Sequence, residues 1–324
     1  MSKVRKNIII TAFFIILIAL SLVIIDYLNP DKDKKKIYKV SYITSSIRDE
    51  NLKLVNDGVS RAAKDLNVEV IVHKLIENKE IEIQMSLLKK EVENNTDAIL
   101  ISPLDYEEIA KYIEKINYKI PIILINSKID SKINMPYISA NNYDLGSDLA
   151  EEVIRCGNTR KNILLVKDDV DISNLEEMRK GFIDELKKSK NSVLEFNLTG
   201  DSKSYYKQIL SFIKENDVDI VVSFNENIIG ILASAIKELI NKNNKFNFQL
   251  YGTSTSNELV GYIEEGIIDG LAIQNQFNIG YLGVDMAIKN ISNRNIDKKE
   301  ISHTIINKEN MYLEKNQKLI FPFN

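Results

Sequence analysis

The sequence contains few of the residues on which disulfide, metal and cofactor sites depend. The single cysteine, Cys156, cannot form an internal disulfide, and the only histidines are His73 and His303. Neither histidine has a second histidine or cysteine three or four residues away, so we expect no metal site. No Gly-x-Gly-x-x-Gly motif follows a predicted strand, so we expect no dinucleotide and no other cofactor.

An excess of charge of one sign is also missing. The 43 basic side chains are balanced by 46 acidic ones, giving a formal net charge of -3. Nucleic-acid binders carry a basic stripe or a large basic excess, so a nucleic-acid partner is not expected. With 44% hydrophobic residues, 12 glycines and 5 prolines, the composition is typical of a folded globular protein.

A long apolar run lies near the amino terminus. Ile8–Ile25 contains only Thr11 and Ser21 as polar residues, and as a helix it would rise roughly 27 Å, close to a bilayer core. Basic residues precede it, as the positive-inside rule expects: Lys3, Arg5 and Lys6. We predict a single-pass protein of the cell membrane, with residues 1–36 as signal anchor and tether and with extracytoplasmic binding lobes. A cleaved signal peptide and a buried core helix are the alternatives.

Beyond residue 36, short β-rich runs alternate with segments whose apolar residues recur at helical spacing, such as Ile228, Leu232 and Leu239. This alternation predicts an α/β fold with parallel sheets that are covered by helices on both faces. The remaining length favours two domains, because a single hydrophobic core rarely grows larger. The predicted strands are Tyr38–Thr44, Val68–His73, Ala98–Ile101, Ile120–Ile125, Ile163–Lys167, Ile220–Phe224 and Gln249–Gly252.

Small polar side chains follow the ends of the predicted strands. Ligands of parallel α/β sheets bind beyond these carboxyl ends, so we expect a binding site there. Amides and hydroxyls suit a neutral polyhydroxyl or amide ligand, whereas helix capping is the alternative role of each residue. The candidate ligand-binding residues are Ser45, Ser46, Arg48, Asn126, Asn141, Asn142, Asn225, Glu226, Ser254 and Gln274.

Catalytic constellations are not recognisable in the same segments. No base, nucleophile and orienting group stand at a spacing typical of an enzyme, so we expect no catalytic residues. Acidic pairs such as Glu176-Glu177 are interpreted as solvated helix faces.

Several short motifs keep an order and spacing that are found in one protein family. They include Asp57-Gly58-Val59, Ala98-Ile99-Leu100-Ile101-Ser102-Pro103, Ile138-Ser139-Ala140-Asn141-Asn142 with Gly146, Arg179-Lys180-Gly181-Phe182, Phe224-Asn225-Glu226 and Ala272-Ile273-Gln274-Asn275-Gln276. Through them, residues 37–307 resemble the type I periplasmic binding proteins of the ribose and galactose kind.

The resemblance implies two similar Rossmann-like lobes joined by three crossover strands, which close over a small ligand by a hinge motion. The first lobe would comprise residues 37–140 and 275–307, and the second residues 141–274 and 308–324. The crossings are expected near Ala140-Asn141, Gln274-Asn275 and Lys308.

The predicted pocket departs from the sugar-binding pattern of that family. Asn126-Ser127 stands where the family has an Asp-Arg pair, Glu176 where it has an arginine, and Ser254 where it has an aspartate. Losing three of these four charged groups at about 1.5–3 kcal/mol each would weaken the usual sugar pose by a thousandfold or more. Either the ligand differs, or an alignment offset hides groups such as Arg48 or Arg179, or the lobes bind a partner.

These observations lead to one expected function and its alternatives. We expect a membrane-anchored solute-binding protein that encloses a sugar or polyol by closure of its lobes. It would serve ABC-type uptake or act as co-receptor of a sensor kinase, with an ABC permease or a histidine kinase as its partner. The alternatives are an interaction module of the same fold without a small-molecule ligand, and an α/β hydrolase using Glu226 or Asp105.

Overall fold

The structure is a computed structural model that divides into two units, Met1–Ile37 and Tyr38–Asn324. It describes residues 3–28, 36–44, 50–75, 81–168, 172–242, 247–254, 256–293 and 298–320. Inside these ranges, the side chains of residues 3–10, 23, 25–28, 50, 51 and 257 lie outside the described part.

The amino-terminal unit contains helix α1 (Lys3–Leu28), which includes the apolar run Ile8–Ile25. Among the residues that the structure describes, no helix combines the length and the apolar character needed to cross a membrane. This finding overturns the prediction of a single-pass protein of the cell membrane.

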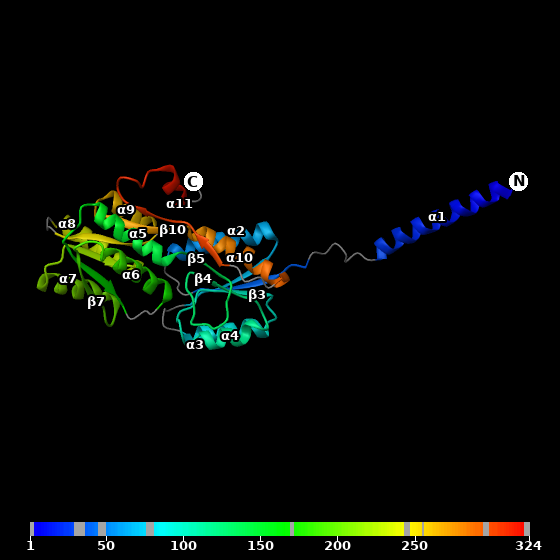
Figure 1. Cartoon of the computed structure of the whole chain (residues 1–324). Helices are drawn as coiled ribbons and strands as arrows, with labels where there is room; N and C mark the ends of the chain where they lie inside the picture. The colour runs from blue at the N-terminus through cyan, green and yellow to red at the C-terminus, as the bar shows by residue number, and fades with distance from the viewer. Residues whose placement is uncertain are drawn as a thin grey trace. The chain divides into compact units, whose positions relative to one another are not determined.

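The second unit contains two sheets, and the first has the strand order β11-β5-β4-β3-β1-β2. Helices α2 and α10 cover one face of this sheet, and α3 and α4 cover the other (Figure 1). We call this body lobe 1. Its strands are β1 (Lys39–Ile43), β2 (Glu69–His73), β3 (Ala98–Ile101), β4 (Ile122–Ile125), β5 (Tyr137–Ala140) and β11 (Lys298–Ile301). Its helices are α2 (Glu50–Leu66), α3 (Ile81–Glu93), α4 (Ala110–Asn117) and α10 (Gln276–Asn293).

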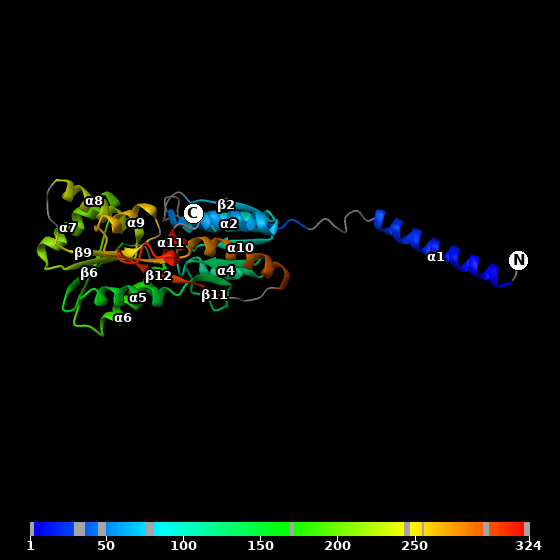
Figure 2. The ribbon, with the colours of Figure 1, turned by 90° about the horizontal axis from the view of Figure 1, so that it is seen from above.

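The second sheet has the order β12-β10-β9-β8-β6-β7 and forms lobe 2. Helices α5 and α6 lie on one face, and α7, α8 and α9 lie on the other (Figure 2). The strands are β6 (Asn162–Lys167), β7 (Ser192–Asn197), β8 (Ile220–Ser223), β9 (Gln249–Thr253), β10 (Gly270–Gln274) and β12 (His303–Ile306). The helices are α5 (Asn142–Arg155), α6 (Ser173–Leu186), η2 (Ser202–Ser204), α7 (Tyr205–Glu215), α8 (Glu226–Asn241), α9 (Asn257–Glu264) and α11 (Glu314–Ile320).

Each sheet is buried on both faces, which explains its nearly continuous apolar strands. In β6, Leu164 and Val166 pack into the core beneath α7, α8 and α9. The alternate residues Ile163 and Leu165 pack into the core beneath α5 and α6. Successive side chains of a strand point to opposite faces, so both faces need apolar residues. The predicted two-lobe α/β fold with parallel sheets is confirmed.

The chain passes between the lobes after β5, after β10 and after β11, at Asn141, Asn275 and Ser302. The third crossing therefore lies before the expected position near Lys308, because His303–Ile306 already pairs with β10. Strand β11 runs parallel to β5, as does the rest of its sheet. A chain that leaves β11 toward lobe 2 enters the second sheet against the direction of β10, and β12 is accordingly antiparallel.

Candidate functional site

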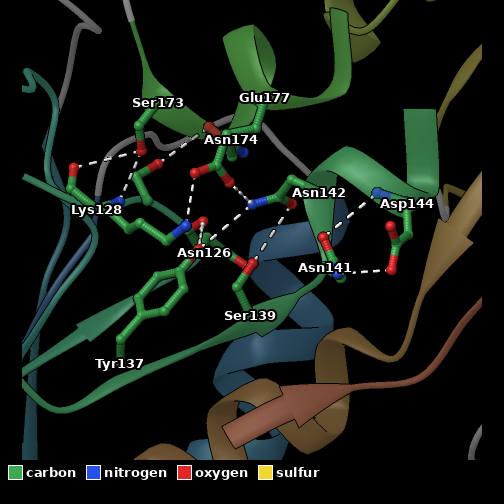
Figure 3. A network of polar contacts seen from close by, with 11 residues as sticks. Asn126, Lys128, Tyr137, Ser139, Asn141, Asn142, Asp144, Ser173, Asn174 and Glu177 are labelled. Atoms are coloured by element: carbon green, nitrogen blue, oxygen red, sulfur yellow. Dashed lines mark hydrogen bonds and ion pairs between the residues drawn. The ribbon is translucent and has the colours of Figure 1, made fainter. Parts of the chain in front are cut away.

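Loops from the carboxyl ends of the two sheets meet at the boundary between the lobes (Figure 3). Ser127, just beyond β4, donates its hydroxyl to Asn174 Oδ1 at 3.1 Å. The backbone N–H of Lys128 donates to Ser173 Oγ at 2.7 Å, and Lys128 Nζ lies 2.6 Å from Glu177 Oε1. Ser173, Asn174 and Glu177 all belong to α6 of lobe 2. We call these five residues the interlobe bridge.

The first crossing is connected to this bridge through Asn142, a side chain that is only 1% exposed. Its Nδ2 donates to Glu177 Oε2 at 3.2 Å and to the Tyr137 hydroxyl at 3.4 Å. The Tyr137 hydroxyl in turn donates to the carbonyl oxygen of Asn126 at 3.0 Å. Burial raises the pKa of Tyr137, so this phenol remains a neutral donor at physiological pH.

Asn126 stands out on two counts. Its φ of 62° is in the left-handed region, which asparagine tolerates better than most residues. Its side-chain oxygen Oδ1 is buried and has no hydrogen-bond partner among the described residues. A buried acceptor without a partner is costly, so Oδ1 is a position at which a ligand hydroxyl or amide would be stabilised.

Asn141 serves the first crossing as a helix cap. Its Oδ1 accepts a hydrogen bond from the Asp144 N–H at 3.3 Å, and its Nδ2 donates to the Asp144 carboxylate at 2.6 Å. Asn141 therefore has the helix-capping role that was the alternative to ligand binding. Of the neighbouring asparagines 141 and 142, Asn142 is the one whose side chain points into the protein.

Beyond the strand ends of lobe 2 lie two hydrogen-bonded pairs of polar side chains, Asn225 with Asp168 and Ser254 with Glu226. Asn225 caps α8 through its Oδ1, which accepts from the Asn227 N–H at 3.0 Å, and its Nδ2 donates to Asp168 Oδ2 at 3.1 Å. Ser254 donates to Glu226 Oε1 and accepts from the Ser256 N–H. Asp168 and Glu226 thus place two carboxylates beyond the carboxyl ends of β6 and β8.

Gln274 ends β10 and links the first two crossings. Its Oε1 accepts from the backbone N–H of Ala140 at 3.3 Å, and the residue is 8% exposed. Gln276, on the other side of the second crossing, is 6% exposed. Its Oε1 lacks a hydrogen-bond partner in the part of the chain that the structure describes.

The candidate residues chosen from the sequence thus form separate groups. Asn126 and Asn142 lie in one network, Asn225 bonds to Asp168, and Glu226 bonds to Ser254. Ser45, Ser46 and Arg48 lie outside the described residues.

Sequence reasoning missed Asp168, Lys128, Glu177 and Gln276. Asp168 directly follows a predicted strand, so the rule used for the other candidates already applied to it. The interpretation of Glu177 as part of a solvated helix face is wrong, since its side chain is 31% exposed and ion-paired to Lys128. Only a contact between segments distant in sequence reveals that role.

Two surface cavities lie in the described part of the chain. One, of about 320 Å³, is lined by α6 residues that include Glu176, Glu177 and Arg179, and the other, of about 310 Å³, lies near Lys161 and Asp219. No group of three or more histidine, cysteine, aspartate or glutamate side chains among the described residues is arranged to hold a metal ion.

Two α/β lobes, linked by crossings at the edge where polar strand ends face each other, define the architecture of hinged binding proteins. A family model described as the periplasmic binding protein domain matches residues 40–295, and the chain belongs to this family. The resemblance found in the sequence is thereby confirmed. None of the curated proteins matches the chain.

Solved structures of solute-binding proteins share the fold. A carbohydrate transporter solute-binding protein from Agrobacterium radiobacter, in complex with D-arabinose, is 22% identical with a TM-score of 0.80, covering 89% of this chain and 100% of that one. An ABC transporter solute-binding protein from Agrobacterium vitis with bound D-fucose is 17% identical with a TM-score of 0.78, covering 87% and 99%. Another from Agrobacterium vitis, bound with alpha-D-tagatopyranose, is 20% identical with a TM-score of 0.77, covering 87% and 98%.

Proposed function

We propose that the protein binds a small sugar or polyol between lobes 1 and 2 and presents it to the permease of an ABC-type transporter. Asn126 carries the proposal, since its buried Oδ1 has no hydrogen-bond partner among the described residues and lies beside the interlobe bridge. A hydroxyl of the ligand would donate to this oxygen and remove the cost of the unpaired acceptor.

Lobe 2 supplies the complementary groups. We assign ligand contacts to Asn225, Glu226 and Ser254, whose side chains now bond to each other or to Asp168. The carboxylates of Asp168 and Glu226 are acceptors only, so they match the hydroxyl donors of a sugar. Hydrogen bonds to charged groups are about twice as strong as neutral ones, so these carboxylates offset part of the loss of the aspartate acceptors at Asn126 and Ser254.

The sugar class is also the ligand class named for the neighbouring structures, which carry D-arabinose, D-fucose and alpha-D-tagatopyranose. Because the charged pair of the usual sugar site is replaced by Asn126-Ser127, we propose a different pose or a different sugar rather than the family's standard one. Gln274 at the second crossing accepts a hydrogen bond from Ala140 at the first, so we propose that it contacts the ligand at the hinge.

Transport is the favoured role for this binding. A co-receptor of a sensor kinase would need a membrane-spanning helix to hold the lobes beside its partner, and no helix of the described residues has the length and apolar character to span a membrane. The three neighbouring structures are described as solute-binding proteins of carbohydrate or ABC transporters. We propose that the bound solute is released unchanged, without catalysis.

A thermal-shift screen of the full chain tests the proposal. D-Arabinose, D-fucose, D-tagatose, polyols and amino acids would each be added in excess. A ligand at about 100 times its dissociation constant stabilises the folded state by about 2.7 kcal/mol, which raises the midpoint by several degrees. We expect a sugar or polyol among the stabilisers, recovered chemically intact after incubation.

Three outcomes would contradict the proposal in different ways. Stabilisation by amino acids alone would reject the ligand class. No stabilisation by any solute would favour an interaction module of the same fold. Conversion of the sugar, abolished by Glu226→Gln, would favour the hydrolase alternative.

A further inference from the structure

The interlobe bridge ties the lobes together with the protein's own side chains. Ser173 Oγ accepts from the Lys128 N–H at 2.7 Å and lies 3.4 Å from the Lys128 carbonyl oxygen, so one hydroxyl holds the backbone of the opposite lobe. The Lys128 ammonium reaches Glu177 at 2.6 Å and lies 5.3 Å from the centroid of the Tyr137 ring. A cation held between a carboxylate and an aromatic face is attracted to both.

Glu177 is the centre of this arrangement. One carboxylate oxygen accepts from Lys128 of lobe 1, and the other accepts from Asn142 at the first crossing. Asn142 continues to the Tyr137 hydroxyl, which donates to the carbonyl oxygen of Asn126. Asn126 lies two residues before Lys128, so these contacts close a ring that fixes the loop in which the ligand acceptor lies (Figure 3).

Separation of the lobes would break this ring between Lys128 and Glu177. Asn142 is the first residue of α5 and directly follows the first crossing, so its contact with Tyr137 lies at the hinge and can survive a rotation of the lobes. The contacts of Lys128 and Ser127 with α6 cannot, because they join different lobes. The side chains of Lys128 and Glu177 are 40% and 31% exposed, so water would solvate both ions at a modest free-energy cost.

We propose that Glu177 is a positioning residue of lobe closure, which holds Lys128 against α6 and so populates the juxtaposed lobes before any solute binds. A ligand that binds only this arrangement gains affinity in proportion to its population. The effect on affinity rests on the proposed function, whereas the effect on the lobes does not.

The chain offers a closely matched control. Lys161 and Asp219 form an ion pair at 2.8 Å with side chains 41% and 31% exposed, nearly the values of Lys128 and Glu177. Both control residues belong to lobe 2, so their pair stays intact when the lobes move apart. Its removal should alter stability similarly without altering lobe closure.

Single-molecule FRET on the full chain tests the inference without solute. Dyes would be attached through Lys89→Cys in α3 and Lys207→Cys in α7, two exposed sites, in a Cys156→Ser background. We expect Glu177→Gln and Lys128→Met each to lower the ratio of short-distance to long-distance molecules about two- to fivefold. The double variant should lower it no further than either single variant, and raising the salt concentration should shrink the difference from the unmodified protein.

Lys161→Met and Asp219→Asn should leave the distance distribution unchanged. An unchanged distribution in Glu177→Gln, or an equal shift in the lobe 2 controls, would overturn the inference. The affinity for D-arabinose serves as a second readout and should fall by no more than the change in population. If D-arabinose and other sugars fail to bind, the proposed function fails while the solute-free distances still decide the role of Glu177.

Discussion

Gly181 of α6 packs directly against the backbone of Tyr143 in α5. A Cβ atom placed at Gly181 would lie 1.9 Å from the carbonyl oxygen of Tyr143. The contact is reciprocal, because a Cβ at Gly146 of α5 would lie 1.9 Å from the carbonyl oxygen of Met178 in α6. The two helices therefore approach to a distance that only glycine permits at these positions.

Lobe 1 repeats this glycine contact between α2 and α10. A Cβ at Gly58 would lie 2.0 Å from the carbonyl oxygen of Phe277, and one at Gly280 would lie 2.0 Å from that of Val55. In both lobes, one helix of the pair begins directly after a crossing. The close packing thus sets where each crossing emerges, and with it the position of the strand ends in the gap.

Gly181→Ala should destabilise the protein by at least about 2 kcal/mol. The new methyl group would clash with a backbone carbonyl, which cannot move aside as a flexible side chain can. Urea unfolding followed by circular dichroism measures the loss. The matched control is Gly261→Ala in α9, where a Cβ would meet nothing within 4 Å. That variant should be neutral or stabilising by up to about 1 kcal/mol, as alanine is the better helix former. Equal stabilities of the two variants would contradict the packing described.

The fold could be predicted where strands are buried on both faces. Ala98–Ile101, Ile122–Ile125 and Ile220–Ser223 are buried at every position, and every residue in them except Ser223 is apolar, which is visible in the sequence. β7 and β11 gave no such signal, because they form sheet edges and keep exposed positions. The third crossing was misplaced for the same reason, since Lys298–Ile301 contains a single buried residue.

The candidate site could be predicted only in part. The rule that ligands bind beyond strand ends selects Asn126, Asn225 and Gln274 by their position alone. It does not show that Asn141 caps a helix while Asn142 turns inward, because both are asparagines at the same junction. The same rule does not predict the ion pair between Lys128 and Glu177, because that contact depends on how the two lobes are placed relative to each other.

Replacing Asn126 separates its proposed ligand contact from its effect on the backbone. Asn126→Gly keeps the left-handed φ accessible and removes the amide, so stability should stay within about 1 kcal/mol of the unmodified protein. The affinity for the sugar identified by the thermal screen should fall up to about tenfold, as for one lost neutral hydrogen bond. Calorimetric titration measures the affinity.

Asn126→Ala should lose the same affinity and a further 1 kcal/mol or so of stability, because alanine disfavours a φ of 62°. Unchanged affinity in Asn126→Gly would remove this residue from the ligand contacts.

Glu226→Gln should weaken solute binding by about one to two orders of magnitude, because a charged acceptor becomes a neutral one. Glu238→Gln, on the exposed side of the same helix α8, is the matched control and should bind normally. Titration of both variants with the same sugar makes the comparison. Normal binding by Glu226→Gln would exclude this carboxylate from the ligand contacts.

Glu152 gives the protein a predictable response to acid. Its carboxylate accepts from Arg155 Nε at 2.7 Å and from Asn307 Nδ2 at 2.6 Å, which ties the carboxyl-terminal segment to α5. The hydrogen bonds from Arg155, then those from Asn307, lower the pKa of Glu152 below its ordinary value of 4.5. A carboxylate with a lowered pKa stabilises the fold above the unfolded pKa and loses that contribution as the pH falls through the folded value.

Glu152→Gln should therefore lower the free energy of unfolding by about 1–3 kcal/mol at pH 7, and this difference should shrink as the pH falls below about 4.5. Urea unfolding at a series of pH values measures the difference. Glu151→Gln, at an exposed position next to it on α5, should differ little from the unmodified protein at any of these pH values. A difference that stays constant or grows toward low pH would show that the Glu152 carboxylate is not stabilised by Arg155 and Asn307, because only an ionised partner gains from them.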